Sequence, residues 1–285
     1  MAGSFAQDAT VLSEQKISDT QGNFLEPLAN SDKFGNAVAG IGDLDGDGIE
    51  DIVVGADGQG VGGSIYVLFM NTDGTVSTSQ QITEGIGGMV GNLDSGDDFG
   101  YSVASIGDLD NDGVVDIVVG SEEDSDDGSS QGAVWILFLN TDGTVKAEQK
   151  INESNGGFTG TLDVNDRFGY AVAGIGDLDN DGNEDIAVGA LLDDDGGNGR
   201  GACWILFMNS DGTVASHQKI SDTDGGFSGV LQDTDNLGSG VAGLGDLDGD
   251  GTEDIAVSAY LDDDGATNAG AVYIMFLNSS GTVSS

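Results

Sequence analysis

Basic residues are scarce in this 285-residue chain. It has 7 Lys and Arg side chains against 51 Asp and Glu, which gives a formal net charge of −44 at pH 7. A chain with this charge is repelled by nucleic acid and by anionic membrane surfaces, so both are excluded as partners unless a cation bridges the contact. Apolar residues still make up 38% of the sequence, which is enough for a packed core, so the charge does not predict disorder.

Cysteine and long apolar runs are also nearly absent. The single cysteine, Cys203, excludes an internal disulfide and a cysteine zinc cluster. No apolar run approaches the roughly 20 residues that cross a membrane, so membrane insertion is not expected. Residues 1–5 lack the basic and apolar regions of a secretory signal peptide, so export would need a signal removed from this sequence or another route. Residues 1–9 are expected to be a disordered or artificially added tail.

Aspartate, in contrast, is abundant. The sequence holds 41 Asp and 10 Glu. General solubility would use either acid, whereas oxygen-rich metal loops and turns favour the shorter side chain. The composition therefore favours metal loops, with an acid-coated surface for a salty environment as the alternative.

The chain is organised as four repeats. An aromatic-rich segment occurs four times at a spacing of 69 residues, at 65–71, 134–140, 203–209 and 272–278. A second marker, Asp-Leu-Asp-x-Asp-Gly, begins at Asp43, Asp108, Asp177 and Asp246, at spacings of 65, 69 and 69. The difference places a four-residue deletion in the first copy. The repeats are predicted at about 19–83, 84–152, 153–221 and 222–285, the last together with 10–18.

Each copy predicts four short strands. The first is rich in small residues, as a strand near a central axis would be (171–175), and the second is a short apolar run (186–189). The third, around Trp204, is longer and aromatic, and the fourth is polar with apolar ends (145–151). Asn-Thr/Ser-Asp-Gly sequences join the third strand to the fourth as tight hairpins. Four-stranded units at a fixed period predict an all-β protein, a β-propeller.

The two ends of the chain are out of phase with the blades. Residues 10–17 read as an outer strand with no blade before it, and the last copy stops at 282–285, where an outer strand begins. The simplest prediction is that the N-terminal strand completes the last blade and closes a four-bladed ring, so that residues 10–285 form one monomeric domain. The alternatives are a half-ring that pairs into an eight-bladed homodimer and an arc from a longer tandem array.

Residues 43–51 form an oxygen-rich loop. Carboxylates stand at positions 1, 3, 5 and 9 of this loop, and Gly48 permits its sharp turn. Position 7 varies chemically among the copies, as expected if only its backbone carbonyl coordinates; the residues there are Ile49, Val114, Asn183 and Thr252. Hard oxygen ligands at this number suit Ca²⁺ better than Mg²⁺, so about four Ca²⁺ are expected. The alternative is a run of Asx-type turns without metal.

These residues carry a family resemblance. Phe-Gly pairs (34–35, 99–100, 168–169) precede the loops and Gly-Ala pairs (55–56, 189–190) follow them, which resembles the FG-GAP repeats of the integrin α N-terminal propeller and of many bacterial extracellular proteins. Leu237, Ser121 and Ser258 depart from the pattern, and the integrin propeller has seven blades. The resemblance implies that Ca²⁺ is held by the matching carboxylates: Asp43, Asp45, Asp47 and Asp51; Asp108, Asp110, Asp112 and Asp116; Asp177, Asp179, Asp181 and Asp185; Asp246, Asp248, Asp250 and Asp254.

The long connections between strands 2 and 3 and between successive repeats are expected to share the face opposite the metal loops. Such loops on a rigid scaffold commonly carry recognition. The candidates for a ligand face are the acidic segments 122–127, 193–195 and 262–264 with Phe158, Phe227 and Arg200. The alternative is that these acidic loops are merely solvated.

Catalysis is not expected. The sole histidine, His217, aligns with variable polar residues on an outer strand and is predicted to be solvated, so no nucleophilic triad is available. Cys203 aligns with Ile65, Val134 and Val272 and is predicted to be a small apolar core residue. No catalytic residue and no organic cofactor is predicted.

Two classes of function fit the sequence. The favoured one is a noncatalytic calcium-binding adhesion module that is extracellular or at the cell surface and recognises a protein or glycan. The alternative is a carbohydrate- or phospholipid-processing hydrolase, or its accessory propeller. No Arg-Gly-Asp sequence is present, so the chain is not an integrin ligand by that route.

Overall fold

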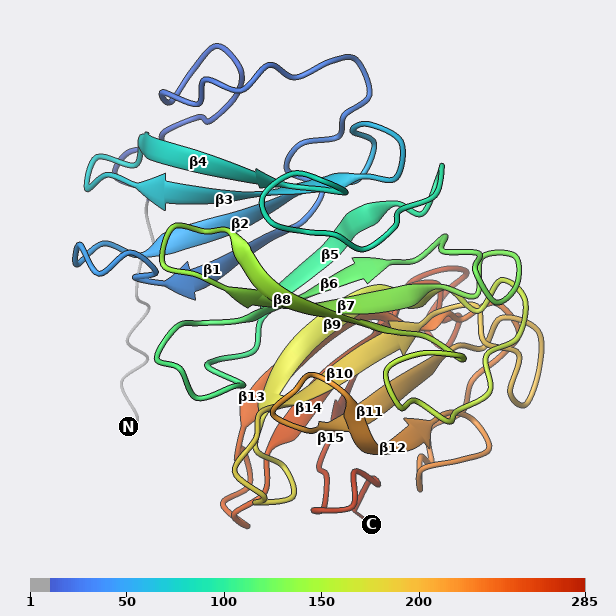
Figure 1. The fold of residues 1–285 in the computed structure, drawn as a ribbon. Helices are drawn as coiled ribbons and strands as arrows, with labels where there is room; N and C mark the ends of the chain where they lie inside the picture. The colour runs from blue at the N-terminus through green and yellow to red at the C-terminus, as the bar shows by residue number, and fades with distance from the viewer. Residues whose placement is uncertain (1–10, 285) are drawn as a thin grey trace, which may run out of the picture.

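The computed structural model describes residues 11–284, which form four antiparallel sheets, here called blades 1 to 4 (Figure 1). None of these residues forms a helix long and apolar enough to cross a membrane. The all-β prediction with four blades is confirmed, and the predicted tail of residues 1–9 lies outside the described part. The strands are β1 (Val38–Gly42), β2 (Asp51–Ala56), β3 (Ser64–Met70) and β4 (Val76–Ile82) in blade 1; β5 (Phe99–Ser105), β6 (Ile117–Ser121), β7 (Ala133–Leu139) and β8 (Val145–Ile151) in blade 2; β9 (Phe168–Gly176), β10 (Asp185–Ala190), β11 (Ala202–Met208) and β12 (Val214–Ile220) in blade 3; β13 (Leu237–Gly245), β14 (Asp254–Ala259) and β15 (Ala271–Met275) in blade 4.

Successive blades pack face to face and bury apolar side chains between them. The apolar side chains of β3 and β7 form one core between blades 1 and 2, and the same positions of β7 and β11 form the next core between blades 2 and 3. A third core lies between blades 3 and 4. β7 and β11 are fully buried because each lies between two sheets, which explains their continuous apolar sequence.

The Phe-Gly and Gly-Ala pairs are two halves of one contact between blades. A Cβ added to Gly189 would lie 1.9 Å from the carbonyl oxygen of Gly238 in the next blade. The corresponding distance from Gly55 to the oxygen of Gly100 is 2.0 Å. Only glycine fits in the second strand at this approach, so the motif fixes how closely successive blades pack near the axis.

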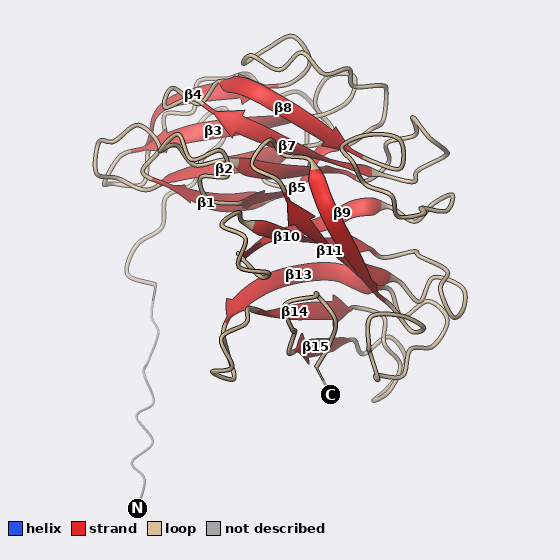
Figure 2. Ribbon diagram, turned by 60° about the horizontal axis from the view of Figure 1, so that its bottom comes forward, coloured by secondary structure: helices blue, strands red, loops and turns tan. Residues whose placement is uncertain are grey.

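The four blades form an open arc, and the predicted ring closure is wrong for this structure. Parallel bridges join each blade to the next, at Gly63–Phe99, Gly132–Phe168 and Gly201–Leu237. Within residues 11–284 no such bridge joins Gly270 of blade 4 to Phe34 of blade 1. Figures 1 and 2 show blades 1 and 4 at opposite ends of a fan.

Blade 4 accordingly has three strands, not four. The chain's own Val283 begins its outer strand through an antiparallel bridge to Leu277. Residues 11–17 instead lie along blade 1, where Gln15 approaches Gly74, and they are not part of a sheet. The number of strands correctly predicted that blade 4 lacks a complete outer strand, but it did not predict where residues 11–17 lie. Ring closure depends on the angle between packed sheets, and the number of strands says nothing about this angle.

Candidate metal centre

Four acidic loops lie on one face of the arc, each between the first and second strand of its blade. We call them loops 1 to 4, residues 43–51, 108–116, 177–185 and 246–254. Their position-9 aspartate is buried and bonded to the backbone on two sides. Asp51 accepts the amide protons of Leu44 and Met70, both at 3.0 Å. The same two bonds recur in loops 2, 3 and 4, so this residue ties each loop to the end of the third strand.

Three carboxylates converge in every loop. Their oxygens lie within 4.8 Å of one another in the sets Asp43, Asp45 and Asp51; Asp108, Asp110 and Asp116; Asp177, Asp179 and Asp185; Asp246, Asp248 and Asp250. Because Ca²⁺ binds oxygen at about 2.3–2.6 Å, ligands on opposite sides of one ion stand about 5 Å apart. Each cluster therefore has the donor type and the spacing to hold a divalent cation.

The structure brings together most of the predicted ligands, with one difference between loops. Positions 1, 3 and 9 converge in loops 1 to 3, whereas positions 1, 3 and 5 converge in loop 4. The position-5 carboxylates of the first three loops, such as Asp47, and the position-9 Asp254 stand outside the clusters. Asp47 accepts the amide proton of Ile49 at 2.9 Å, so it shapes the turn at position 7.

Backbone amides also curl each loop around its first carboxylate. Asp108 accepts the amide protons of Asp112 at 2.9 Å and of Gly113 at 2.8 Å, and Gly113 has a φ of +91°. Asp112 in turn accepts the amide proton of Val114, two residues on, at 2.9 Å, which is an Asx-type turn of the kind considered as the metal-free alternative. These hydrogen bonds are compatible with metal binding, because a carboxylate oxygen that accepts one hydrogen bond keeps a second lone pair.

Burial and mutual repulsion disfavour the charged form of the clustered carboxylates. Burial, with smaller contributions from the nearby Asp179 and Asp181, raises the pKa of Asp185 to about 7. Burial likewise raises the pKa of Asp116 to about 6. A bound cation would oppose both effects, because it favours the charged carboxylate.

A lysine side chain from a neighbouring strand reaches loop 2, and it was not predicted from the sequence. Lys146, at the start of β8, places Nζ 2.8 Å from Asp110 and also contacts Asp112. The corresponding outer-strand residues Ser77 and Ala215 cannot do this. The contact could have been predicted from the lysine that one repeat has at this position, on the outer strand that faces the loop.

The opposite face of the arc carries the long connections, as strand parity predicts. We call it the long-loop face; it consists of residues 57–63, 122–132, 191–201 and 260–270 with 83–98, 152–167 and 221–236. Its acidic segments in blades 2 and 3 are paired with lysines. Lys219 lies 2.6 Å from Asp193 and 2.8 Å from Asp195, and a lysine has the same position in blade 2. Arg200 is not free, since it pairs with Asp222 at 2.6 Å and with Asp233.

Two aromatic residues assigned to a ligand face, and the histidine, are structural. Phe158 is buried, with its ring centroid 5.1 Å from that of Trp204. Phe227 packs on Tyr273 at 5.1 Å. His217 is half-buried against Phe158 rather than solvated, and this burial lowers its pKa. Residue spacing does not distinguish exposed loop aromatics from rings that fold back onto their own blade.

Cys203 confirms the prediction of a core residue. It is fully buried between blades 3 and 4, and burial raises its thiol pKa to about 12. A thiol in this position is unreactive because the thiolate is not formed.

A central cavity opens among the first strands of all four blades, at their long-loop ends. Its volume is about 330 Å³, and its lining includes Asn36, Tyr101, Tyr170 and Ser239. The two tyrosine rings are partly exposed, with centroids 4.9 Å apart. These four residues occupy one repeat position, which varies while its neighbours repeat, and this variation was the signal for the cavity.

The fold and the loops together define a β-propeller built of acidic-loop repeats. Residues 43–119 match the FG-GAP-like repeat family, and residues 237–275 match the FG-GAP repeat. These matches and the acidic loops give the chain an FG-GAP-type propeller that resembles the propeller of integrin α chains.

Several integrin α chains are similar in sequence. Identity is 34% over 165 residues with integrin alpha-3 of Cricetulus griseus, covering 56% of this chain and 14% of that protein. It is 36% over 174 residues with integrin alpha-6 of Homo sapiens, covering 59% and 13%. It is 28% over 265 residues with integrin alpha-4 of Xenopus laevis, covering 92% and 23%. The chain thus spans less than a quarter of the length of these relatives.

Proposed function

We propose that this protein is a noncatalytic, calcium-binding recognition module that acts outside the cell or at its surface. The observation that carries the proposal is the fourfold recurrence of three carboxylate oxygens within 4.8 Å in loops of one shape. Millimolar external Ca²⁺ saturates sites of the weak extracellular class, which suits exposed loops of this kind. The similarity to integrin α chains supports an adhesion-related role.

The ligand site that the geometry favours is the central cavity on the long-loop face. Tyr101 and Tyr170 offer flat, partly exposed rings, and Asn36 offers an amide that donates and accepts hydrogen bonds. Aromatic rings with a few polar groups suit a sugar or a polar protein loop. The ligand is therefore a protein or glycan, and Ca²⁺ at the opposite end would stabilise the scaffold that holds the cavity.

Metal binding is tested by metal analysis of the dialysed protein and by calcium titration calorimetry. Asp179→Ala removes a carboxylate of a cluster and should lower the number of bound Ca²⁺ by about one. Asp194→Ala, which removes an acid from the long-loop face, is the matched control and should leave this number unchanged. A protein that retains no Ca²⁺ and shows no binding heat would refute the assignment.

Recognition is tested by a glycan array and by binding to extracellular matrix proteins, each with and without Ca²⁺. Tyr170→Ala should abolish binding to any ligand found, whereas Val230→Ala on the same face should not. Binding that is unaffected by Tyr170→Ala would move the ligand site away from the cavity.

A further inference from the structure

Blade 4 exposes apolar positions that the other blades bury. Val272, Ile274 and Phe276 are 66%, 46% and 37% exposed, and Leu244 and Leu247 are 39% and 56% exposed. Their counterparts in blade 3 are no more than 4% exposed, because blade 4 covers them. A contiguous apolar face of this kind marks an interaction site.

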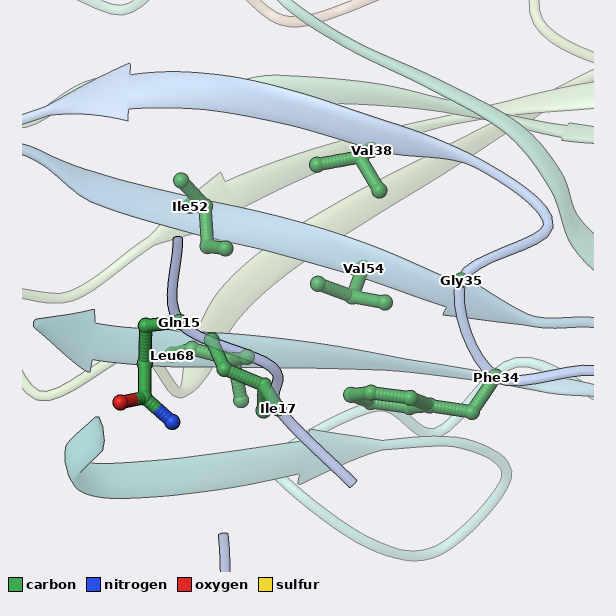
Figure 3. A pocket seen from close by; sticks show the side chains of 8 residues that line it. All are labelled: Gln15, Ile17, Phe34, Gly35, Val38, Ile52, Val54 and Leu68. Atoms are coloured by element: carbon green, nitrogen blue, oxygen red, sulfur yellow. The ribbon is translucent and has the colours of Figure 1, made fainter. Parts of the chain in front are cut away.

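Blade 1 carries the complementary surface. A cavity of about 260 Å³ lies between residues 11–17 and the outward face of the sheet, lined by Ile17, Phe34 and Val38 among others (Figure 3). In blade 2 the corresponding surface is covered by the third strand of blade 1. The counterparts of those covering side chains in blade 4 include Val272 and Ile274, the same side chains that blade 4 leaves exposed.

Residues 11–17 hold the place of an outer strand from a preceding blade. The Cβ of Gln15 lies 3.2 Å from where a Cβ on Gly74 would stand, and Gln149 of blade 2 has the same relation to Gly212 of blade 3 at 3.2 Å. Gln15 also donates to the carbonyl of Lys16 at 2.8 Å, as Gln149 does to its following residue at 2.7 Å. The segment therefore lies on blade 1 as β8 lies on blade 3, but without its own sheet.

The charged residues indicate independently that residues 11–17 align with the outer strands of the other blades. Lys16 is the counterpart of Lys219, which neutralises the acid pair of the long loop in blade 3. Blade 4 repeats this pair as Asp262 and Asp264, yet no lysine of residues 11–284 pairs with it. Beside it, Asp235 is 1% exposed and its Oδ1 has no hydrogen-bond partner. Lys16 is exposed and forms no ion pair in the described part of the chain.

We propose that two copies of this chain associate head to tail, so that blade 4 of one copy packs on blade 1 of the other. Residues 13–17 of the second copy would then continue the outer strand that Val283 begins in the first, with Lys16 between Asp262 and Asp264. The occupant is a second copy because residues 11–17 are already seated on blade 1, away from their own blade 4. The same contact at both junctions closes a two-fold ring of eight blades.

The junction is looser near the axis than the contacts within one copy. Ser258 stands where Gly189 approaches the carbonyl of Gly238 in the next blade. A side chain there keeps the partner's Gly35 farther away, so the outer strand and the apolar side chains of β15 provide most of the contact. Ser258→Gly should therefore strengthen the association.

The test is the mass of the full chain in Ca²⁺ at physiological salt, by light scattering and sedimentation. We expect a dimer of twice 28.8 kDa. Lys16→Asp and Asp264→Lys should each give monomers, because each variant places like charges at both junctions. An equimolar mixture of the two variants should restore the dimer, since one junction then has the reversed pair and the other has the native pair.

Controls separate this contact from misfolding and from general stickiness. Both charge variants change exposed side chains, so their circular dichroism spectra should match that of the native chain, and only the stabilisation that association provides should be lost from their melting temperature. Ile274→Asp should abolish the dimer, whereas Val61→Asp, at an exposed apolar residue away from both faces, should not. A native chain of 28.8 kDa at micromolar concentration, or a mixture that stays monomeric, would overturn the proposal.

Discussion

Removal of divalent cations should destabilise this protein strongly. Each of the four loops holds three carboxylate oxygens within 4.8 Å, and burial of the position-9 side chain keeps part of this charge away from water. A site saturated at 100 times its Kd adds about 2.7 kcal/mol to the free energy of unfolding, so four independent sites add about 11 kcal/mol. That equals the whole stability of an ordinary domain. At about 2 °C per kcal/mol, chelation should lower the melting temperature by about 20 °C.

The assay is thermal unfolding followed by circular dichroism, in 1 mM Ca²⁺ and in excess EGTA. Added NaCl at matched ionic strength is the control, because it screens the exposed acids but does not fill the clusters. Calcium should restore the melting temperature, and NaCl should restore only a small part of it. A melting temperature that EGTA leaves unchanged, or that NaCl restores completely, would refute the reasoning.

Three further predictions concern single residues. Lys146→Ala should tighten Ca²⁺ binding at loop 2, because it removes the ammonium that pairs with the loop; a calorimetric titration in which no site strengthens would contradict this. In EGTA the melting temperature should rise as pH falls from 8 to 5, because the folded-state pKa of Asp185, about 7, lies above its unfolded value of about 3.9, so the native state binds the proton more tightly. The stabilisation by Ca²⁺ should shrink over the same range, and a scan of melting temperature against pH in both buffers checks the two signs. Gly189→Ala should cost about 1–3 kcal/mol or more, because its Cβ would meet Gly238, whereas Gly265→Ala, with nothing within 4 Å, should cost far less in a urea titration.

The repeats and the acidic loops could be predicted from the sequence because their signals are local. Alternation of Asp in residues 43–51 indicates that carboxylates gather in the loop, and the recurrence of the loop four times removes chance as an explanation. The finer division of roles could not be predicted. Asp47 and Asp51 are the same residue type in the same loop, yet one shapes the turn and the other ties the loop to β3.

The sites assigned to the long-loop face were less predictable because they depend on where long side chains go. Phe158 and Arg200 lie on loops in the structure, as predicted from the sequence. However, the Phe158 ring folds into the core, and the Arg200 guanidinium is held by two carboxylates. Neither outcome is contained in residue spacing. The central cavity escaped for a related reason, since Tyr101 and Tyr170 come together only when separate blades are placed around one axis.

Departures from the repeat are more informative about function than the repeat itself. Positions that recur in all copies build the blade, as Gly189 does by permitting close packing. Positions that vary are free of that task. Tyr170 lines the cavity, Lys146 pairs with the carboxylates of loop 2, and Ser258 stands at the face that no other blade of the same copy covers. Lys16 departs in place rather than in type: it is the lysine of an outer strand, separated from the acid pair that its counterpart in blade 3 neutralises. In a chain of nearly identical units, specific recognition therefore has to arise from the residues that break the symmetry.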